Sequence, residues 1–214
     1  MLGLDEQRTT WRRNHVAAVD AFLLTGAAGV LLLVLLSLFF VEPSVWSEVL
    51  SQLVLVGSVL GGTALAWRLH GHRLTRATWV SLVLCAIGGA IVAVPVFLAL
   101  VTLGRLVPLP ADYPEGPWGA VLIVTLVVVA FLAGPVVGSI REFGSGSAGR
   151  TIAGLRLGAL AVIIAVIIVT ISIGGELAEA AMFMAPVAAA SAAAIVGVAA
   201  VDKWRASHNS PRPG

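Results

Sequence analysis

Long apolar runs alternate with short polar segments along this chain of 214 residues. A helix that crosses the hydrocarbon core of a bilayer needs about 20 predominantly apolar residues. Six runs reach that length, and they are continuous rather than alternating, which argues against membrane strands. The predicted spans are 17–41, 48–67, 78–103, 117–140, 151–173 and 177–201. The pattern therefore predicts an all-α integral membrane protein, with six transmembrane helices packed in a compact bundle over 17–201.

Two further features support a membrane protein. Only 11% of the residues are charged, whereas soluble domains carry about 25%. The first apolar run is too long for a cleavable signal peptide, whose apolar core has about 7–15 residues. The single cysteine, Cys85, excludes an internal disulfide or a thiol metal cluster.

The cations show an asymmetry that predicts orientation. Eleven of the thirteen Lys and Arg residues lie in the N-terminal segment 1–16, the second and fourth connections or the tail 202–214. Arg156 lies just inside the fifth span on the same side, and Arg105 is the exception. Cytoplasmic segments of membrane proteins are enriched in Lys and Arg. We therefore expect both termini to be cytoplasmic in a multi-pass protein of the cell membrane. These cations give the chain its net positive charge, and they can contact anionic lipid headgroups. No nucleic-acid partner is expected, because no binding module is present.

Small residues predict how the helices pack, since close approach drives association in lipid. The alanine-rich last span is expected to be buried among its neighbours, and the Ile/Val-rich fifth span is expected to face lipid. Three GxxxG pairs indicate further packing sites: Gly57/Gly61, Gly134/Gly138 and Gly154/Gly158.

Three prolines lie inside predicted spans: Pro95, Pro135 and Pro186. Each removes a backbone hydrogen bond and favours a helix kink. Two interpretations stay open, because proline is tolerated in membrane helices but also marks the broken helices beside transporter cavities.

Enzyme signatures are absent, and we expect no catalytic residue, cofactor or metal. There is no H-E-x-x-H zinc motif or G-x-S-x-G elbow, and the glycine-rich run 143–150 lacks the Lys-Ser/Thr ending of a phosphate loop. The four histidines lie outside the spans. His70 and His72 are the one metal-binding pair considered, and a solvated loop is the favoured interpretation, since no carboxylate or thiol lies nearby in the sequence.

Asp20 and Arg156 lie inside spans near the predicted cytoplasmic side. Asp20 is interpreted either as a carboxylate that interacts with a helix dipole near the start of the first helix or as the partner of Arg156. Arg156 lies one to two turns into its span, where its long side chain can reach the headgroups. An Asp20–Arg156 pair at the cytoplasmic mouth is one hypothesis.

Glu176 and Glu179 lie at the opposite end, in the stretch GGELAEAA. Two glycines predict a turn, so Glu176 is expected to begin the last helix beside water. Glu179 lies about 4.5 Å further along the helix axis. Because an ionisable group inside the membrane boundary usually faces a bundle interior or wet cavity, we expect Glu179 to point inward and bind a proton, a cation or a cationic solute.

Two functions follow from these patterns. The first is a small-solute or ion transporter, or the membrane subunit of a transport complex, with an outward-facing site near Glu179. The second is a non-transporting assembly, anchoring or immunity factor that binds a partner through its helix surfaces. The expected partners are membrane lipids and either partner subunits or further copies of the chain.

Overall fold

A computed structural model describes residues 2–39, 45–106, 118–145, 149–173 and 176–209. It contains six long helices, which confirms the predicted all-α architecture. They are α1 (Leu2–Phe39), α2 (Val45–Leu69), α3 (Arg76–Arg105), α4 (Trp118–Ser145), α5 (Arg150–Ile173) and α6 (Glu176–Asn209). The first and last helices extend beyond the predicted spans, since α1 includes most of the segment 1–16 and α6 continues into the tail.

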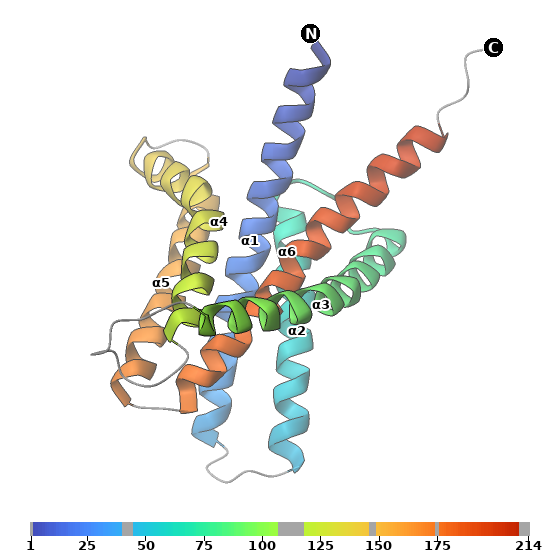
Figure 1. The fold of residues 1–214 in the computed structure, drawn as a ribbon. Helices are drawn as coiled ribbons and strands as arrows, with labels where there is room; N and C mark the ends of the chain where they lie inside the picture. Colours follow the sequence, from blue (N-terminus) through green and yellow to red (C-terminus); the bar gives the residue numbers. More distant parts are fainter. Residues whose placement is uncertain (1, 40–44, 107–117, 146–148, 174–175, 210–214) are drawn as a thin grey trace, which may run out of the picture.

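The helices α1 and α6 form the centre of the bundle. The two helices pack extensively on each other. In addition, α2 and α5 pack against α1, and α3 packs against α6. Figure 1 shows α4 and α5 on one side of α1, and α3 crossing in front of α6. The end of the bundle at which α1 starts and α6 ends, at the top of Figure 1, is called the termini end. This arrangement places α1 against four of the other five helices.

The small side chains of α6 allow its central position. Ala188, Ala190, Ala194, Ile195 and Val198 are all almost fully buried, as predicted for this span. A helix with such short side chains lets neighbouring backbones approach closely, which favours packing in lipid.

The fifth helix behaves in the opposite way, again as predicted. Its branched side chains are exposed on the outer surface of the bundle, as Ile164, Ile167, Ile168 and Val169 show. Such a face is suited to contact with lipid chains.

The prediction that the GxxxG pairs pack within the chain is wrong. A Cβ added at Gly57, Gly61, Gly134, Gly138 or Gly158 would meet nothing within 4 Å, and one at Gly154 would make only ordinary contact with Phe143. The close approaches occur at other glycines, namely Gly26, Gly29, Gly62, Gly89 and Gly197. GxxxG spacing places two glycines on one helix face but does not determine what that face meets.

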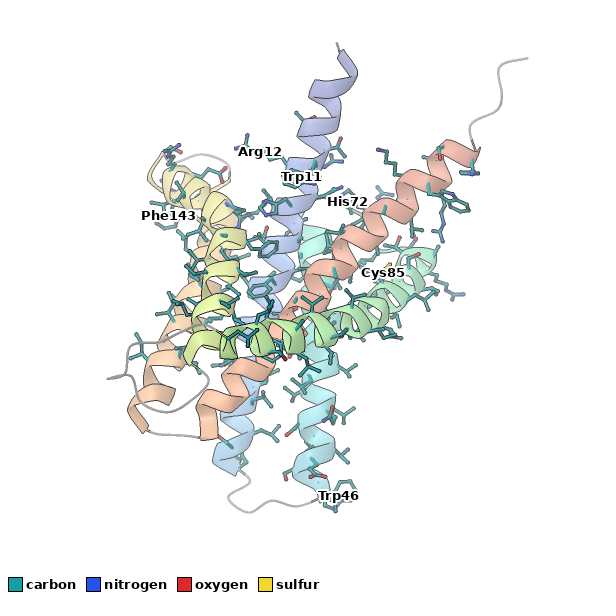
Figure 2. All side chains as sticks on the ribbon, in the orientation of Figure 1. Trp11, Arg12, Trp46, His72, Cys85 and Phe143 are labelled. Atoms are coloured by element: carbon teal, nitrogen blue, oxygen red, sulfur yellow. The ribbon has the colours of Figure 1, made fainter. Side chains whose placement is uncertain are left out.

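All six helices contain a candidate membrane span of 20 to 29 residues with high mean hydropathy. Exposed tryptophans lie at both ends of the bundle, with Trp11 near the termini end and Trp46 at the opposite end (Figure 2). Tryptophan is enriched at membrane–water interfaces. The helices and their tryptophans therefore fit a bundle that crosses a bilayer.

Candidate functional site

The carboxylate of Asp20 is buried in the interior of the bundle. Its side chain is only 3% exposed. Because α1 begins at Leu2, Asp20 lies about five turns into the helix. The interpretation of Asp20 as a group stabilised by the start of the helix is therefore wrong, since that effect is confined to the first turn. A charge at this depth needs a partner inside the protein.

Arg156 provides that partner, as the sequence predicted. Nε of Arg156 donates to Oδ1 of Asp20 at 2.5 Å, and Nη2 donates to Oδ2 at 2.9 Å. The Arg156 side chain is 6% exposed, so both partners are withdrawn from water. Two parallel hydrogen bonds of this kind are the strongest geometry available to an arginine and a carboxylate. They join α1 to α5 across 136 positions of sequence.

The other terminal nitrogen of Arg156 binds α4. Its Nη1 donates to Oγ of Ser139 and to the carbonyl of Pro135, the latter at 3.3 Å. The Ser139 hydroxyl in turn donates to the same carbonyl at 2.8 Å. Ser139 is fully buried, and a buried guanidinium is tolerated only when its donors are used in this way.

His70 adds α2 to the group, because its Nε2 donates to Oδ2 of Asp20 at 2.8 Å. The end of α2 explains how a residue beyond the helix reaches this position. The amide of Gly71 bonds to the carbonyl of Arg68 and the amide of His72 bonds to that of Trp67, which is the Schellman pattern. Gly71 has φ of +79°, a left-handed conformation that glycine adopts without strain. The turn fixes His70 at the helix end with its ring toward α1.

These side chains form what we call the polar cluster: Asp20, His70, Ser139 and Arg156. It joins α1, α4 and α5 to the end of α2. The His70 side chain, at 12% exposure, is its most accessible member. There is no water-sized space beside the Asp20–Arg156 pair. The cluster is thus a closely packed contact between helices that are far apart in the sequence.

The sequence pattern did not indicate the roles of His70 and Ser139 in this cluster. The solvated-loop interpretation of His70 is wrong, because the ring is largely buried against Asp20. The glycine at position 71 was a usable signal, since glycine just after an apolar helix commonly marks its C-terminal cap. Ser139 carried no such signal, because most serines in membrane helices bond only to their own backbone.

His70 and His72 do not form a metal site. The His70 ring bonds to Asp20, whereas the His72 ring stacks on Trp67 with 4.3 Å between centroids. Among the described residues, no three His, Cys, Asp or Glu side chains lie close enough to hold a metal ion. Figure 2 shows His72 near α1 and α6 toward the termini end.

His72 lies outside the candidate spans and gives a pH prediction. Burial lowers the pKa of His72 below its usual value of about 6.5, and nearby Arg13 acts in the same direction. The folded chain therefore binds this proton less readily than the unfolded chain does. Stability contributed by neutral His72 is present above about pH 6.5 and is lost as the pH falls below that value.

We expect the thermal unfolding midpoint of the detergent-solubilised protein to fall more between about pH 8 and about pH 5.5 in the wild type than in His72→Gln. The other titrating groups are common to both proteins, so the difference isolates His72. An equal fall in the two proteins would contradict the lowered pKa.

The structure describes the backbone of Glu176 and Glu179 but not their side chains. The helix α6 begins at Glu176, as predicted, and Glu179 belongs to its first turn. The side chains of both residues lie outside the described part of the structure, so the inward orientation of Glu179 stays a prediction.

The three prolines lie inside helices, Pro95 in α3, Pro135 in α4 and Pro186 in α6. Pro135 supplies the carbonyl that Arg156 binds. Pro186 lines an apolar cavity of about 300 Å³ between α1, α3, α4 and α6. The neighbours of Pro95 in α3, Val96 and Phe97, line the same cavity. Pro186 therefore lies beside a cavity whose lining is apolar, and the interpretation of the three prolines as marks of a transporter cavity stays a prediction.

Comparisons with protein-family models, curated proteins and solved structures found no match for this chain. Its class follows from the fold alone. Six candidate spans with lipid-exposed apolar faces mark it as a multi-pass membrane protein.

Proposed function

We propose that the chain is a small-solute or ion transporter, or the membrane subunit of a transport complex, and that the polar cluster closes its path at the termini end. The observation that supports this proposal most is the buried pair of Asp20 and Arg156 inside candidate spans. Ionisable groups at such depth are rare and commonly mark transport pathways, relays or counter-ions.

The proposed mechanism uses the position of the cluster between helices. Separating α1 from α5 would break the Asp20–Arg156 contact and admit water between them, with His70 as the group nearest the aqueous side. By the distribution of cations, this is the cytoplasmic side. Glu179, near the opposite end of α6, is the proposed binding group of the outward-facing site. The described geometry then corresponds to a state closed at the termini end.

Water access to the cluster tests this proposal without knowledge of a substrate. Cys85 is the single cysteine, so Cys85→Ser gives a cysteine-free background. Leu23→Cys in that background introduces a thiol at a fully buried position that lines the space beside Asp20 and Arg156. The protein is reconstituted in liposomes and treated with a membrane-impermeant cationic thiosulfonate, which reacts only with hydrated thiols.

We expect slow labelling of Leu23→Cys from the termini side, accelerated several-fold when Asp20→Asn weakens the pair. The matched control is Ile195→Cys, which is equally buried but lies in the contact of α6 with α1 and α2, and it should stay unlabelled in both backgrounds. Absence of labelling at Leu23→Cys in both backgrounds would reject a path through the cluster.

The second candidate is the non-transporting factor that binds a partner through its helix surfaces. The observations that favour it are the closely packed polar cluster and the exposed glycine pair Gly57 and Gly61, where an added Cβ would meet no described residue within 4 Å. Small-residue faces of this kind suit helix association in lipid. Co-purification from native membranes of a stoichiometric partner that is lost in Gly61→Leu, together with an unlabelled Leu23→Cys, would establish this candidate in place of transport.

A further inference from the structure

The cavity between α1, α3, α4 and α6 lies in the part of the bundle on the far side of the polar cluster from the termini end. Its volume is about 300 Å³, at the small end of the range for ligand pockets. Its inner walls include Pro186 and Ala189 of α6, together with Phe22 of α1 and Phe131 of α4. The side chains that line it are all hydrocarbon, so it offers no side-chain hydrogen bond to water or to a polar solute.

The surroundings of the cavity identify what can fill it. Its lining residues belong to candidate spans in all four helices, so the medium outside is the hydrocarbon of the bilayer. Val96 and Val127, on the α3 and α4 walls, are 52% and 51% exposed. These half-exposed walls make the cavity open toward the lipid-facing surface rather than toward water.

We propose that this cavity binds one acyl chain of a bilayer phospholipid. Phospholipid chains are the apolar molecules present at the highest concentration along this surface, and a volume of about 300 Å³ has room for part of one chain and not for two. An empty cavity would forfeit the van der Waals contacts of its lining, and a seated chain restores them. This inference goes beyond transport, because the chain would be bound whether or not the bundle moves a solute.

Two aromatic rings end the cavity at its inner side. Phe22 and Phe131 pack edge to face with 5.7 Å between centroids. Phe22 follows Asp20 by two residues, and Phe131 lies one turn before Pro135, whose carbonyl binds Arg156. The rings therefore line the cavity on α1 and α4, two of the helices that carry the polar cluster. A bound lipid supports the same segments of α1 and α4 that hold the cluster together.

Native mass spectrometry of the purified full chain tests the site. The protein is exchanged through mild detergent, delipidated and then supplied with dioleoylphosphatidylcholine. The variant is Ala189→Phe, which places a ring in the cavity. Its control is Ala99→Phe, at an exposed position of α3 that does not line the cavity. We expect wild type and Ala99→Phe to retain one phospholipid, and the dissociation constant of the phospholipid to rise about ten-fold in Ala189→Phe, which corresponds to about 1.4 kcal/mol.

Thermal unfolding gives the second readout. Because a ligand that binds only the folded state raises its stability, added phospholipid should raise the unfolding midpoint of wild type and Ala99→Phe more than that of Ala189→Phe. If Ala189→Phe aggregates, Ala189→Leu replaces it, with a smaller loss expected. Equal phospholipid retention by all variants would show only annular lipid and would overturn the proposal. The proposal would also be overturned if the wild type retained a fatty acid or another apolar molecule in place of the phospholipid, or retained nothing. Cysteine labelling at the polar cluster does not enter this test, so the two proposals can fail separately.

Discussion

Replacing Arg156 with methionine is expected to lower the free energy of unfolding by about 3–5 kcal/mol, the cost of removing one partner from a buried ion pair. The Asp20 side chain is only 3% exposed, and the substitution removes the arginine that forms two hydrogen bonds with its carboxylate. His70 alone remains as a hydrogen-bond donor to it. The Ser139 hydroxyl keeps its bond to the carbonyl of Pro135, so the loss falls mainly on Asp20. Unfolding of the detergent-solubilised protein by increasing SDS measures the change.

Three further variants identify the cause of the loss. Asp20→Leu combined with Arg156→Met removes both charges and should recover most of the stability, because an apolar pair of similar volume needs no partner. Arg156→Lys keeps the charge but loses the two-pronged geometry, so an intermediate value is expected. The control is Arg205→Met, whose ion pair with Asp202 is 4.0 Å long and about half exposed, and which should change little. An Arg156→Met effect as small as that of Arg205→Met would contradict a buried pair.

The Asp20–Arg156 contact could be predicted because so few groups compete for either partner. A charge within a span has to be paired or to reach the headgroups, and both residues lie near the same predicted side. What the sequence could not provide was the depth of Asp20. The polar residues at 5–15 read as a segment outside the membrane, whereas they continue the same helix, so the apparent start of the span was mistaken for the start of the helix.

The six helices were predictable for a different reason. In lipid, every backbone polar group has to be satisfied within its own segment, so a long apolar run leaves little choice but a helix. The partner of each helix face is not specified in the same way. Gly61 and Gly62 are adjacent in sequence and equally small, yet the first faces outward and the second contacts α1. Only the arrangement of helices in space distinguishes them.

That difference gives the second large effect, a loss of stability in Gly62→Ala. A Cβ at Gly62 would lie close to Oγ1 of Thr25 and only 2.8 Å from the Thr25 backbone nitrogen. A side chain can rotate away, but a helix backbone cannot, so α2 has to move away from α1. The shift also strains the bond from the Thr25 hydroxyl to the carbonyl of Ser58, now 3.2 Å. Overpacking of this kind costs about 1–3 kcal/mol, and SDS unfolding again measures it.

Gly61→Ala is the matched control, one residue away on the same helix. Its added methyl group meets nothing within 4 Å, and alanine is a better helix former than glycine, so no loss is expected. Equal losses in the two variants would indicate a general effect of altering α2 rather than a close contact at Gly62.

The same contact between α1 and α2 should also support the polar cluster, since His70 follows α2 and Asp20 belongs to α1. If the shift caused by Gly62→Ala draws His70 away from Asp20, then His70→Ala should cost less in the Gly62→Ala background than in the wild type. Residues that share a contact show such non-additive losses, whereas independent sites add within about 0.3–0.5 kcal/mol. Strict additivity would mean that the end of α2 keeps its position when the helices separate at Gly62, and that the Gly71 turn rather than helix packing holds His70 against the carboxylate.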